Sequence, residues 1–240
     1  MALFVLVPGA WLGGWCWREV AARIRADGHS VVAATLTGLG ERAHQLTRET
    51  GLHTHVADIV EILRCRDLTE AVLVGHSYGG MVVTAVAEQA AERLLGLVYL
   101  DASVPLDGQS NDDVIGPAMA ARLRAAARAY GDGWRVPPPD DVTETLPEGL
   151  HAWVRERLTP HPLRSFVEPV QLRSSAAAEL PRAFVRTTHS PLYDRLLEAA
   201  RKAGWWCREQ SGGHYAMLSE PGAVAAALAE IAAKGLRGER

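Results

Sequence analysis

A G-x-S-x-G motif at residues 75–79 directly follows four apolar residues, and an alanine-rich segment with helical periodicity comes after it. This order predicts a buried strand, a sharp turn and a helix. At such a turn the serine is held in a strained conformation with its hydroxyl above the sheet, and the flanking glycines let other backbone pass close by. An ordinary tight turn is the alternative, but the strand and helix on either side favour Ser77 as an exposed nucleophile.

Apolar runs and amphipathic segments alternate along the rest of the chain. Strands are predicted at residues 3–7, 31–34, 71–74, 97–100, 184–187 and 205–208, and helices at residues 17–26, 54–64, after the serine turn to about 92, 192–203 and 222–234. This alternation predicts an α/β fold, with a parallel sheet of about six strands flanked by helices and joined by right-handed crossovers.

The pattern changes between residue 105 and about residue 180. Prolines cluster here, the helical stretches are short, and no strand signal occurs. A chain of 240 residues is long enough to build one large core. We therefore expect a single domain over residues 1–240, with residues 105–180 inserted as a lid of helices and loops.

Charge and cysteine usage exclude several classes of function. The 25 basic and 28 acidic side chains give a net charge of −3, and no basic block suggests a nucleic-acid or membrane-surface partner. Cys16, Cys65 and Cys207 are far apart and form no C-x-x-C pair, which is evidence against a disulfide framework or a zinc site. Reduced thiols in a cytoplasmic protein are the simpler interpretation.

The apolar start at residues 2–7 is too short for a signal-peptide core and lacks a basic flank, so it is interpreted as a strand. No apolar run approaches the length of a membrane span. No metal ligand set or cofactor motif stands out. The expected partner is a small-molecule substrate, and the expected assembly is a monomer or homodimer.

His214 is the candidate base. A serine hydroxyl is a poor nucleophile until a base accepts its proton, and a third group must hold that base in the right tautomer. His214 lies in a glycine-flanked loop between the last predicted strand and the last predicted helix. A solvated loop histidine is the alternative, and the serine turn upstream favours the base. His76, inside that turn, is expected to pack behind Ser77.

The oxyanion formed during acyl transfer needs two backbone N–H donors. One is expected from Tyr78, the residue after the nucleophile, and the other from the loop that follows the first strand. Pro8 has no N–H and Gly9 is expected to make the turn. Ala10 is therefore the predicted second donor, and Trp11 is the alternative.

Three segments, residues 4–15, 75–80 and 213–218, resemble α/β-hydrolases. They are most similar to a small-esterase branch that contains plant methyl esterases, hydroxynitrile lyases and EstC-like bacterial esterases. The resemblance covers the chain except for the predicted lid, and it implies a cofactor-free hydrolase with a serine, a histidine and an acid. Pro8 is a departure, because the plant relatives usually carry histidine there.

The acid is the second departure from this family. Most relatives carry it just after the next-to-last strand, where this chain has no acidic residue until Asp194. Asp101 instead ends the strand that follows the serine turn, and some lipases of the fold take their acid from that strand. Asp101 is therefore predicted to hold the Nδ1–H of His214. Asp194, Asp107 and a purely structural role of Asp101 in capping a turn are the alternatives.

Together these residues predict a serine esterase that cleaves a carboxylic ester of a small apolar or aromatic substrate through an acyl-enzyme. A dehalogenase would carry aspartate in place of Ser77. Hydroxynitrile lyases have a lysine just after the histidine, where this chain has Tyr215. The alternatives that stay open are a cofactor-free lyase, cyclase or decarboxylase of natural-product biosynthesis, and a hydrolase-like small-molecule receptor.

The substrate is expected to bind between the serine turn and the lid. Aromatic side chains near these segments are predicted to contact it, although packing within the lid is the alternative. They are Trp11, Tyr78, Trp134, Trp153, His161 and Phe166.

Overall fold

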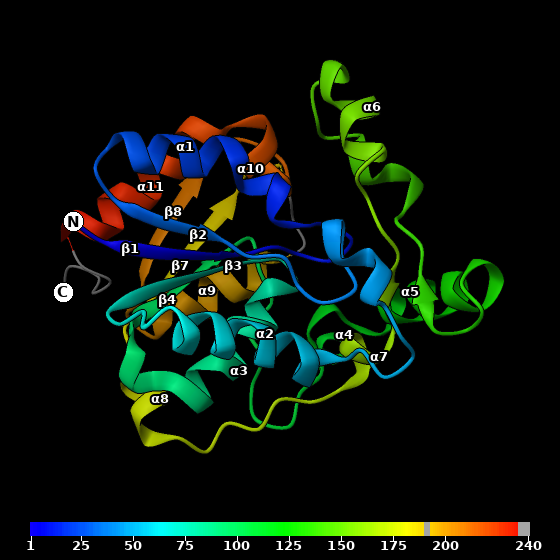
Figure 1. The fold of residues 1–240 in the computed structure, drawn as a ribbon, viewed down its shortest axis with the longest axis horizontal. Helices are drawn as coiled ribbons and strands as arrows, with labels where there is room; N and C mark the ends of the chain where they lie inside the picture. The colour runs from blue at the N-terminus through cyan, green and yellow to red at the C-terminus, as the bar shows by residue number, and fades with distance from the viewer. Residues whose placement is uncertain (190–192, 235–240) are drawn as a thin grey trace.

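A parallel sheet of six strands forms the centre of the computed structural model, which describes residues 1–189 and 193–234 (Figure 1). The strands run in the order β2-β1-β3-β4-β7-β8, and every pair is parallel. They are β1 (Leu3–Val7), β2 (Ser30–Ala33), β3 (Ala71–His76), β4 (Leu94–Leu100), β7 (Arg182–Thr187) and β8 (Trp206–Gln210). The predicted six-stranded parallel sheet is confirmed.

The strand that leads into the serine turn is the most protected part of this sheet. All six residues of β3 are buried, as expected for a strand covered on both faces. Val7 of β1 pairs with Gly75, and His76 pairs with Leu100 of β4. The loops that follow β1, β3 and β4 therefore emerge together at one edge of the sheet.

Helices cover both faces of the sheet (Figure 1). Phe4 and Leu6 of β1 point to a cluster with α1 and α11, whereas Val5 and Val7 point to a cluster with α2, α3 and α9. The covering elements are α1 (Arg18–Ala26), α2 (Leu52–Cys65), α3 (Gly79–Ala90), α9 (Asp194–Lys202), α10 (Ala216–Ser219) and α11 (Pro221–Lys234), with the short helices η1 (Gly14–Trp17), η2 (Gly40–Gln45) and η3 (Ala91–Arg93). Alternation of side chains along each strand thus divides the core into two layers.

Element boundaries differ from the predictions by a few residues. β4 begins three residues before position 97, and α2 begins at Leu52, two residues before the predicted start at position 54. The helix predicted over 192–203 corresponds to α9, and residue 192 lies outside the described residues. End residues lack full periodic signals, so such shifts are expected.

The segment over residues 105–180 lies between β4 and β7, and in Figure 1 its helices α5 and α6 lie beyond the end of the sheet. It contains α4 (Asn111–Ile115), α5 (Pro117–Tyr130), β5 (Arg135–Val136), η4 (Asp140–Thr143), α6 (Glu148–Arg155), β6 (His161–Pro162), α7 (Arg164–Val167) and α8 (Ser175–Glu179). The expectation of no strands was wrong, because β5 and β6 form an antiparallel pair. Each has only two residues, too few for a periodic signal. The segment's role as a lid and the single-domain organisation stay predictions.

Gly80, in the first turn of α3, is expected to be essential for packing. A Cβ built there would overlap the carbonyl oxygen of Ser103. Gly80→Ala should therefore lower the free energy of unfolding by about 1–3 kcal/mol, the usual cost of overpacking. Chemical denaturation measures the change.

Gly149→Ala in α6 is the matched control, because a Cβ there meets nothing within 4 Å. The free energy of unfolding should stay the same or rise by up to about 1 kcal/mol, owing to the helix propensity of alanine. Equal stability of Gly80→Ala and the wild-type protein would contradict the packing argument.

Candidate active site

Ser77 stands between β3 and α3 in a left-handed backbone conformation, with a φ of 53°. Such a φ is strained for a residue with a side chain, and strained residues concentrate at functional sites. A Cβ on Gly75 would lie 2.5 Å from the carbonyl oxygen of Gly79, so the turn closes only because this position is glycine. The predicted strand, turn and helix at this motif are all present.

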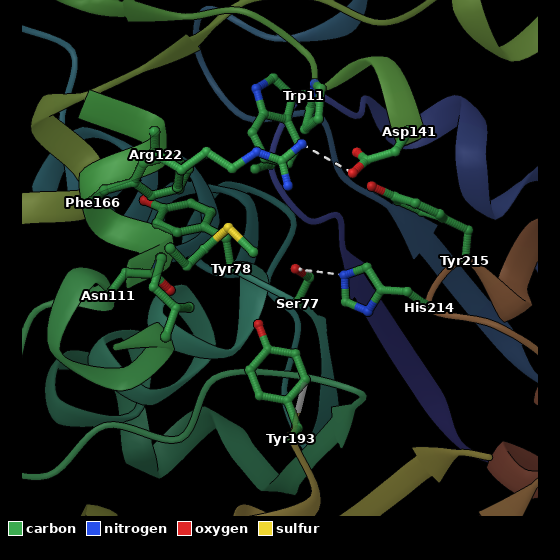
Figure 2. Close-up of a pocket in the computed structure, with 15 residues that line it drawn as sticks. Trp11, Ser77, Tyr78, Asn111, Arg122, Asp141, Phe166, Tyr193, His214 and Tyr215 are labelled. Carbon is green, nitrogen blue, oxygen red and sulfur yellow. Dashed lines mark hydrogen bonds and ion pairs between the residues drawn. The ribbon is translucent and has the colours of Figure 1, made fainter. Parts of the chain in front are cut away.

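His214 lies between the carboxylate of Asp101 and the hydroxyl of Ser77, and Figure 2 shows its contact with Ser77. Its Nδ1 is 2.6 Å from Oδ2 of Asp101, and its Nε2 is 3.0 Å from Oγ of Ser77. A carboxylate only accepts hydrogen bonds, so Nδ1 carries the hydrogen and Nε2 offers its lone pair to the hydroxyl. The structure therefore brings together the three side chains that the sequence singled out for nucleophile, base and acid.

Asp101 is fully buried at the end of β4 and has a φ of 43°. Its second carboxylate oxygen accepts a long hydrogen bond, 3.5 Å, from the backbone N–H of Thr187 at the end of β7. The two contacts orient the carboxylate toward His214.

The two alternative acids lie elsewhere. Asp194 is the first residue of α9, is half exposed, and pairs with Arg186 at 2.6 Å. Asp107 accepts a hydrogen bond from the backbone N–H of Leu172 at 2.7 Å. Neither carboxylate contacts the His214 ring in the described part of the chain.

Ala10 and Tyr78 are the two residues whose backbone N–H groups were predicted to bind the oxyanion. Both residues line the cavity together with Ser77. Within residues 1–189 and 193–234, neither N–H has an acceptor. Trp11, the alternative donor, also lines the cavity and has a φ of 65°.

His76 forms a hydrogen bond to the loop that contains His214. It is fully buried, and its Nε2–H donates to the backbone carbonyl of His214 at 2.8 Å. Burial, and to a lesser degree the neighbouring His214, hold the pKa of His76 well below its ordinary value. A neutral His76 thus supports the backbone of the candidate base from behind Ser77.

A cavity of about 160 Å³ opens at Ser77 (Figure 2). It is lined by Ala10, Trp11, Ser77, Tyr78, Asn111, Ile115, Met119, Arg122, Leu123, Pro139, Asp141, Phe166, Tyr193, His214 and Tyr215. More than half of these residues come from the segment over residues 105–180, so that segment forms most of the wall opposite the sheet.

Trp11, Tyr78 and Phe166 line the cavity as predicted, but Trp134 and Trp153 do not. The Trp134 ring lies 5.2 and 5.4 Å from two arginine guanidinium groups. The Trp153 ring lies 4.4 Å from the guanidinium of Arg157. Tryptophan rings attract cations, so each ring has a favourable partner outside the cavity.

His161 also lies outside the cavity wall. It is fully buried, its ring stacks 4.5 Å from Phe166, and its Nε2 is 2.8 Å from Oγ of Ser165. Burial holds the pKa of His161 well below its ordinary value. The prediction of substrate contact is therefore corrected: His161 supports the lining side chains Phe166 and Tyr78 from behind.

Five polar or aromatic side chains that were not predicted to line the cavity also do so, namely Asn111, Arg122, Asp141, Tyr193 and Tyr215. Tyr193 lies on the far side of Ser77 from the Arg122–Asp141 pair in the view of Figure 2. Only Tyr215, which directly follows His214, had a sequence signal that could have identified it. The others lie in segments without a motif.

A buried series of hydrogen bonds links Tyr78 to His55 and Thr37. Nε2 of His55 donates to the carbonyl of Thr37 at 3.0 Å, so Nδ1 of the neutral ring is an acceptor. The Tyr78 hydroxyl therefore donates to Nδ1 of His55, at 2.9 Å. Burial is the main cause that lowers the pKa of His55 from 6.5 to about 4. His55 is therefore neutral at pH 7.

Neither a cluster of possible metal ligands nor a membrane-spanning helix is found in the part of the chain that the structure describes. No group of three or more His, Cys, Asp or Glu side chains there could hold a metal ion. No helix in the same ranges is long and apolar enough to cross a membrane.

Known proteins resemble the chain over nearly its whole length. A model described as the alpha/beta hydrolase family matches residues 4–227. A carbendazim hydrolyzing esterase of Nocardioides sp. (strain SG-4G) is 35% identical over 96% of this chain and 100% of its own length. A putative chloroplastic methylesterase of Arabidopsis thaliana, methylesterase 14, is 26% identical over 95% of this chain and 71% of its own length.

Two solved structures share the fold. An extracellular alpha/beta-hydrolase from a Paenibacillus species has a TM-score of 0.84 at 22% identity, with 96% of this chain and 98% of that chain covered. Tomato methylketone synthase I has a TM-score of 0.82 at 21% identity, with 97% of each chain covered. The chain therefore belongs to the alpha/beta hydrolase family, as its motifs predicted. Its class is that of the carboxylic-ester hydrolases.

The low pKa of His55 predicts a loss of stability in acid. The unfolded chain binds a proton at this histidine below pH 6.5, whereas the folded chain does so only near pH 4. The stability that neutral His55 contributes is thus full above pH 6.5 and is lost as the pH falls toward 4. Between pH 7 and pH 5 this residue should lower the free energy of unfolding by about 2 kcal/mol.

Chemical denaturation of His55→Gln at the two pH values tests this expectation. The variant should lose that part of the pH dependence, whatever its stability at pH 7. His44→Gln, at an exposed histidine, is the matched control and should retain the full pH dependence. An unchanged slope in His55→Gln would show that this residue does not titrate as inferred.

Proposed function

We propose that the chain is a serine esterase that cleaves a small ester with an apolar or aromatic part. The observation that carries the proposal is the His214 ring, held 2.6 Å from the Asp101 carboxylate and 3.0 Å from the Ser77 hydroxyl. This arrangement can remove a proton from the serine and return it to a leaving group. The esterase and methylesterase relatives support the same chemistry.

In the first half of the reaction, Nε2 of His214 accepts the Ser77 proton while Oγ attacks the ester carbonyl. The negative charge that develops on the carbonyl oxygen is stabilised by the N–H groups of Ala10 and Tyr78. Asp101 stabilises the imidazolium ion. His214 then gives its proton to the departing alkoxide, and an acyl-enzyme remains.

In the second half, His214 accepts a proton from water, and the resulting hydroxide attacks the acyl carbon. The same two N–H groups stabilise the second oxyanion. Collapse of that intermediate returns the proton to Oγ of Ser77 and releases the carboxylic acid. No cofactor takes part in this sequence of steps.

The preferred substrate type is inferred from the cavity wall. Trp11, Met119, Leu123 and Phe166 provide apolar and aromatic surface beside Ser77. Most small-molecule sites combine such surface with a few polar groups that set orientation. An ester with a compact aromatic or aliphatic group at the reacting carbonyl fits this wall.

No observation favours a lyase of the hydroxynitrile type. Those enzymes, which the chain resembles in its motifs, use a lysine just after the histidine. Here burial raises the pKa of Tyr215, which keeps its hydroxyl uncharged at neutral pH. A neutral hydroxyl does not replace an ammonium group. The cytoplasmic location and the monomeric or dimeric state stay predictions, and the three free cysteines agree with a reducing compartment.

Ser77→Ala should lower kcat for an activated ester such as p-nitrophenyl acetate by roughly 10⁴-fold or more, because the attacking oxygen is removed. Labelling by a fluorophosphonate probe should disappear in the same variant. Ser30→Ala, at an exposed serine, is the control and should keep both properties. Undiminished hydrolysis by Ser77→Ala would end the serine-esterase proposal.

Asp101→Asn should fold normally but lower kcat by roughly 10²- to 10⁴-fold, since an amide N–H facing Nδ1 favours the wrong histidine tautomer. Asp194→Asn is the matched control at the position nearer the usual place of the acid, and it should keep kcat within about threefold. Circular dichroism verifies the fold of both variants. A near-normal kcat in Asp101→Asn together with a large loss in Asp194→Asn would reverse the assignment.

A further inference from the structure

A second cavity, of about 400 Å³, adjoins the one at Ser77. It is lined by Arg122, Leu123, Ala126, Tyr130, Pro137, Pro138, Pro139 and Asp140. Three of these residues, Arg122, Leu123 and Pro139, also line the cavity at Ser77. The inner cavity at Ser77 and this outer cavity are therefore neighbours with a shared wall.

One face of α5 forms the floor of both cavities. Met119, Arg122, Leu123, Ala126 and Tyr130 follow the i, i+3, i+4, i+7, i+11 spacing of a single helical face. The first three line the inner cavity, and the last four line the outer one. The two cavities thus lie side by side along the same face of this helix.

Arg122, which lines both cavities, forms an ion pair with Asp141. A guanidinium nitrogen of Arg122 lies 3.0 Å from Oδ2 of Asp141, and Figure 2 shows the pair across the cavity from Tyr193. The two side chains are 57% and 45% exposed. Ion pairs this exposed contribute little to stability, so the Arg122 side chain can move aside at small cost.

The inner cavity alone is small for a substrate. Its volume of about 160 Å³ lies below the roughly 300–1,000 Å³ of most small-molecule sites. The outer cavity adds space beside it, and its wall combines three proline rings, a tyrosine ring and aliphatic surface with the charged side chains of Arg122 and Asp140. Tyr130 is 83% exposed, so its ring is accessible to a ligand.

We propose that the outer cavity is a second compartment of the substrate site, which receives the distal apolar arm of an ester, aryl or alkyl. The inference rests on the proposed ester hydrolysis, with the reacting carbonyl at Ser77. The arm extends from Ser77 along α5 and passes the aliphatic stem of Arg122. It then packs against Ala126, Tyr130 and the prolines.

The test measures kcat/KM over two series of esters. In p-nitrophenyl alkanoates from acetate to decanoate the acyl arm grows, and in 4-alkylphenyl acetates the alcohol arm grows. The wild-type enzyme should gain at least about tenfold from the shortest to the longest ester in one series, because each buried methylene contributes. Ala126→Trp fills the outer cavity and should reduce that gain to less than about threefold.

Ala121→Trp is the matched control. Ala121 is exposed on α5 and lines neither cavity, so its replacement should keep the full gain. Tyr130→Ser is a second variant that removes part of the wall without disturbing packing, and it should also lower the gain. It keeps the test decisive if circular dichroism shows that Ala126→Trp is misfolded.

The proposal is overturned if neither series shows a gain, or if the gain survives in Ala126→Trp or, where that variant is misfolded, in Tyr130→Ser. It is also overturned if Ala121→Trp abolishes the gain as strongly as Ala126→Trp does. Short esters turned over by Ser77 without length dependence would refute the outer compartment alone. Absence of any Ser77-dependent hydrolysis would refute the proposed function and this inference together.

Discussion

Two residues held in left-handed backbone conformations at the ends of adjacent parallel strands, Ser77 and Asp101, are the constraint on which the site depends. The backbone ties their turns together: Ser103 N–H donates to the Ser77 carbonyl at 3.0 Å, and Ser77 N–H donates to the Leu100 carbonyl at 3.4 Å. Strain of about 1–3 kcal/mol at each residue persists only because the buried sheet leaves no alternative. His214 then needs to bridge two groups that are already fixed.

The placement of Asp101, the proposed acid, follows from sheet order rather than chain order. β4 and β7 are neighbours, and such strands lie about 4.8 Å apart. The Asp101 N–H donates to the Val185 carbonyl at 2.8 Å, and its carboxylate accepts from Thr187 at the end of β7. The Asp101 carboxylate therefore reaches the end of β7, the next-to-last strand of the sheet in chain order, although it comes from β4. The aspartate side chain and its hydrogen bond to Thr187 together span this one strand spacing.

The sequence predicted the sheet and the positions of Ser77, Asp101 and His214 because each depends on local chemistry. A buried strand next to a G-x-S-x-G turn leaves few folds open, and loops at the ends of parallel strands meet at one edge. The walls of the cavity were harder to predict. Trp134 and Trp153 are as apolar as any pocket residue, but packing against arginines decides which way they face. Contacts of that kind depend on the arrangement of short helices that no periodic pattern specifies.

In the proposed function, reactivity and selectivity are carried by different parts of the chain. The strand ends hold the reacting groups, whereas the segment over residues 105–180 supplies most of the cavity wall. Within it, a shift of α5 by one residue would turn its lining face by about 100° and replace Arg122 and Leu123 with other side chains. Such a change would leave β3, β4 and β8 in place, because these strands are held by their neighbours in the sheet and α5 lies outside it. Substitutions in this segment can thus change which substrate shapes the cavity accepts, while the geometry around Ser77 stays the same.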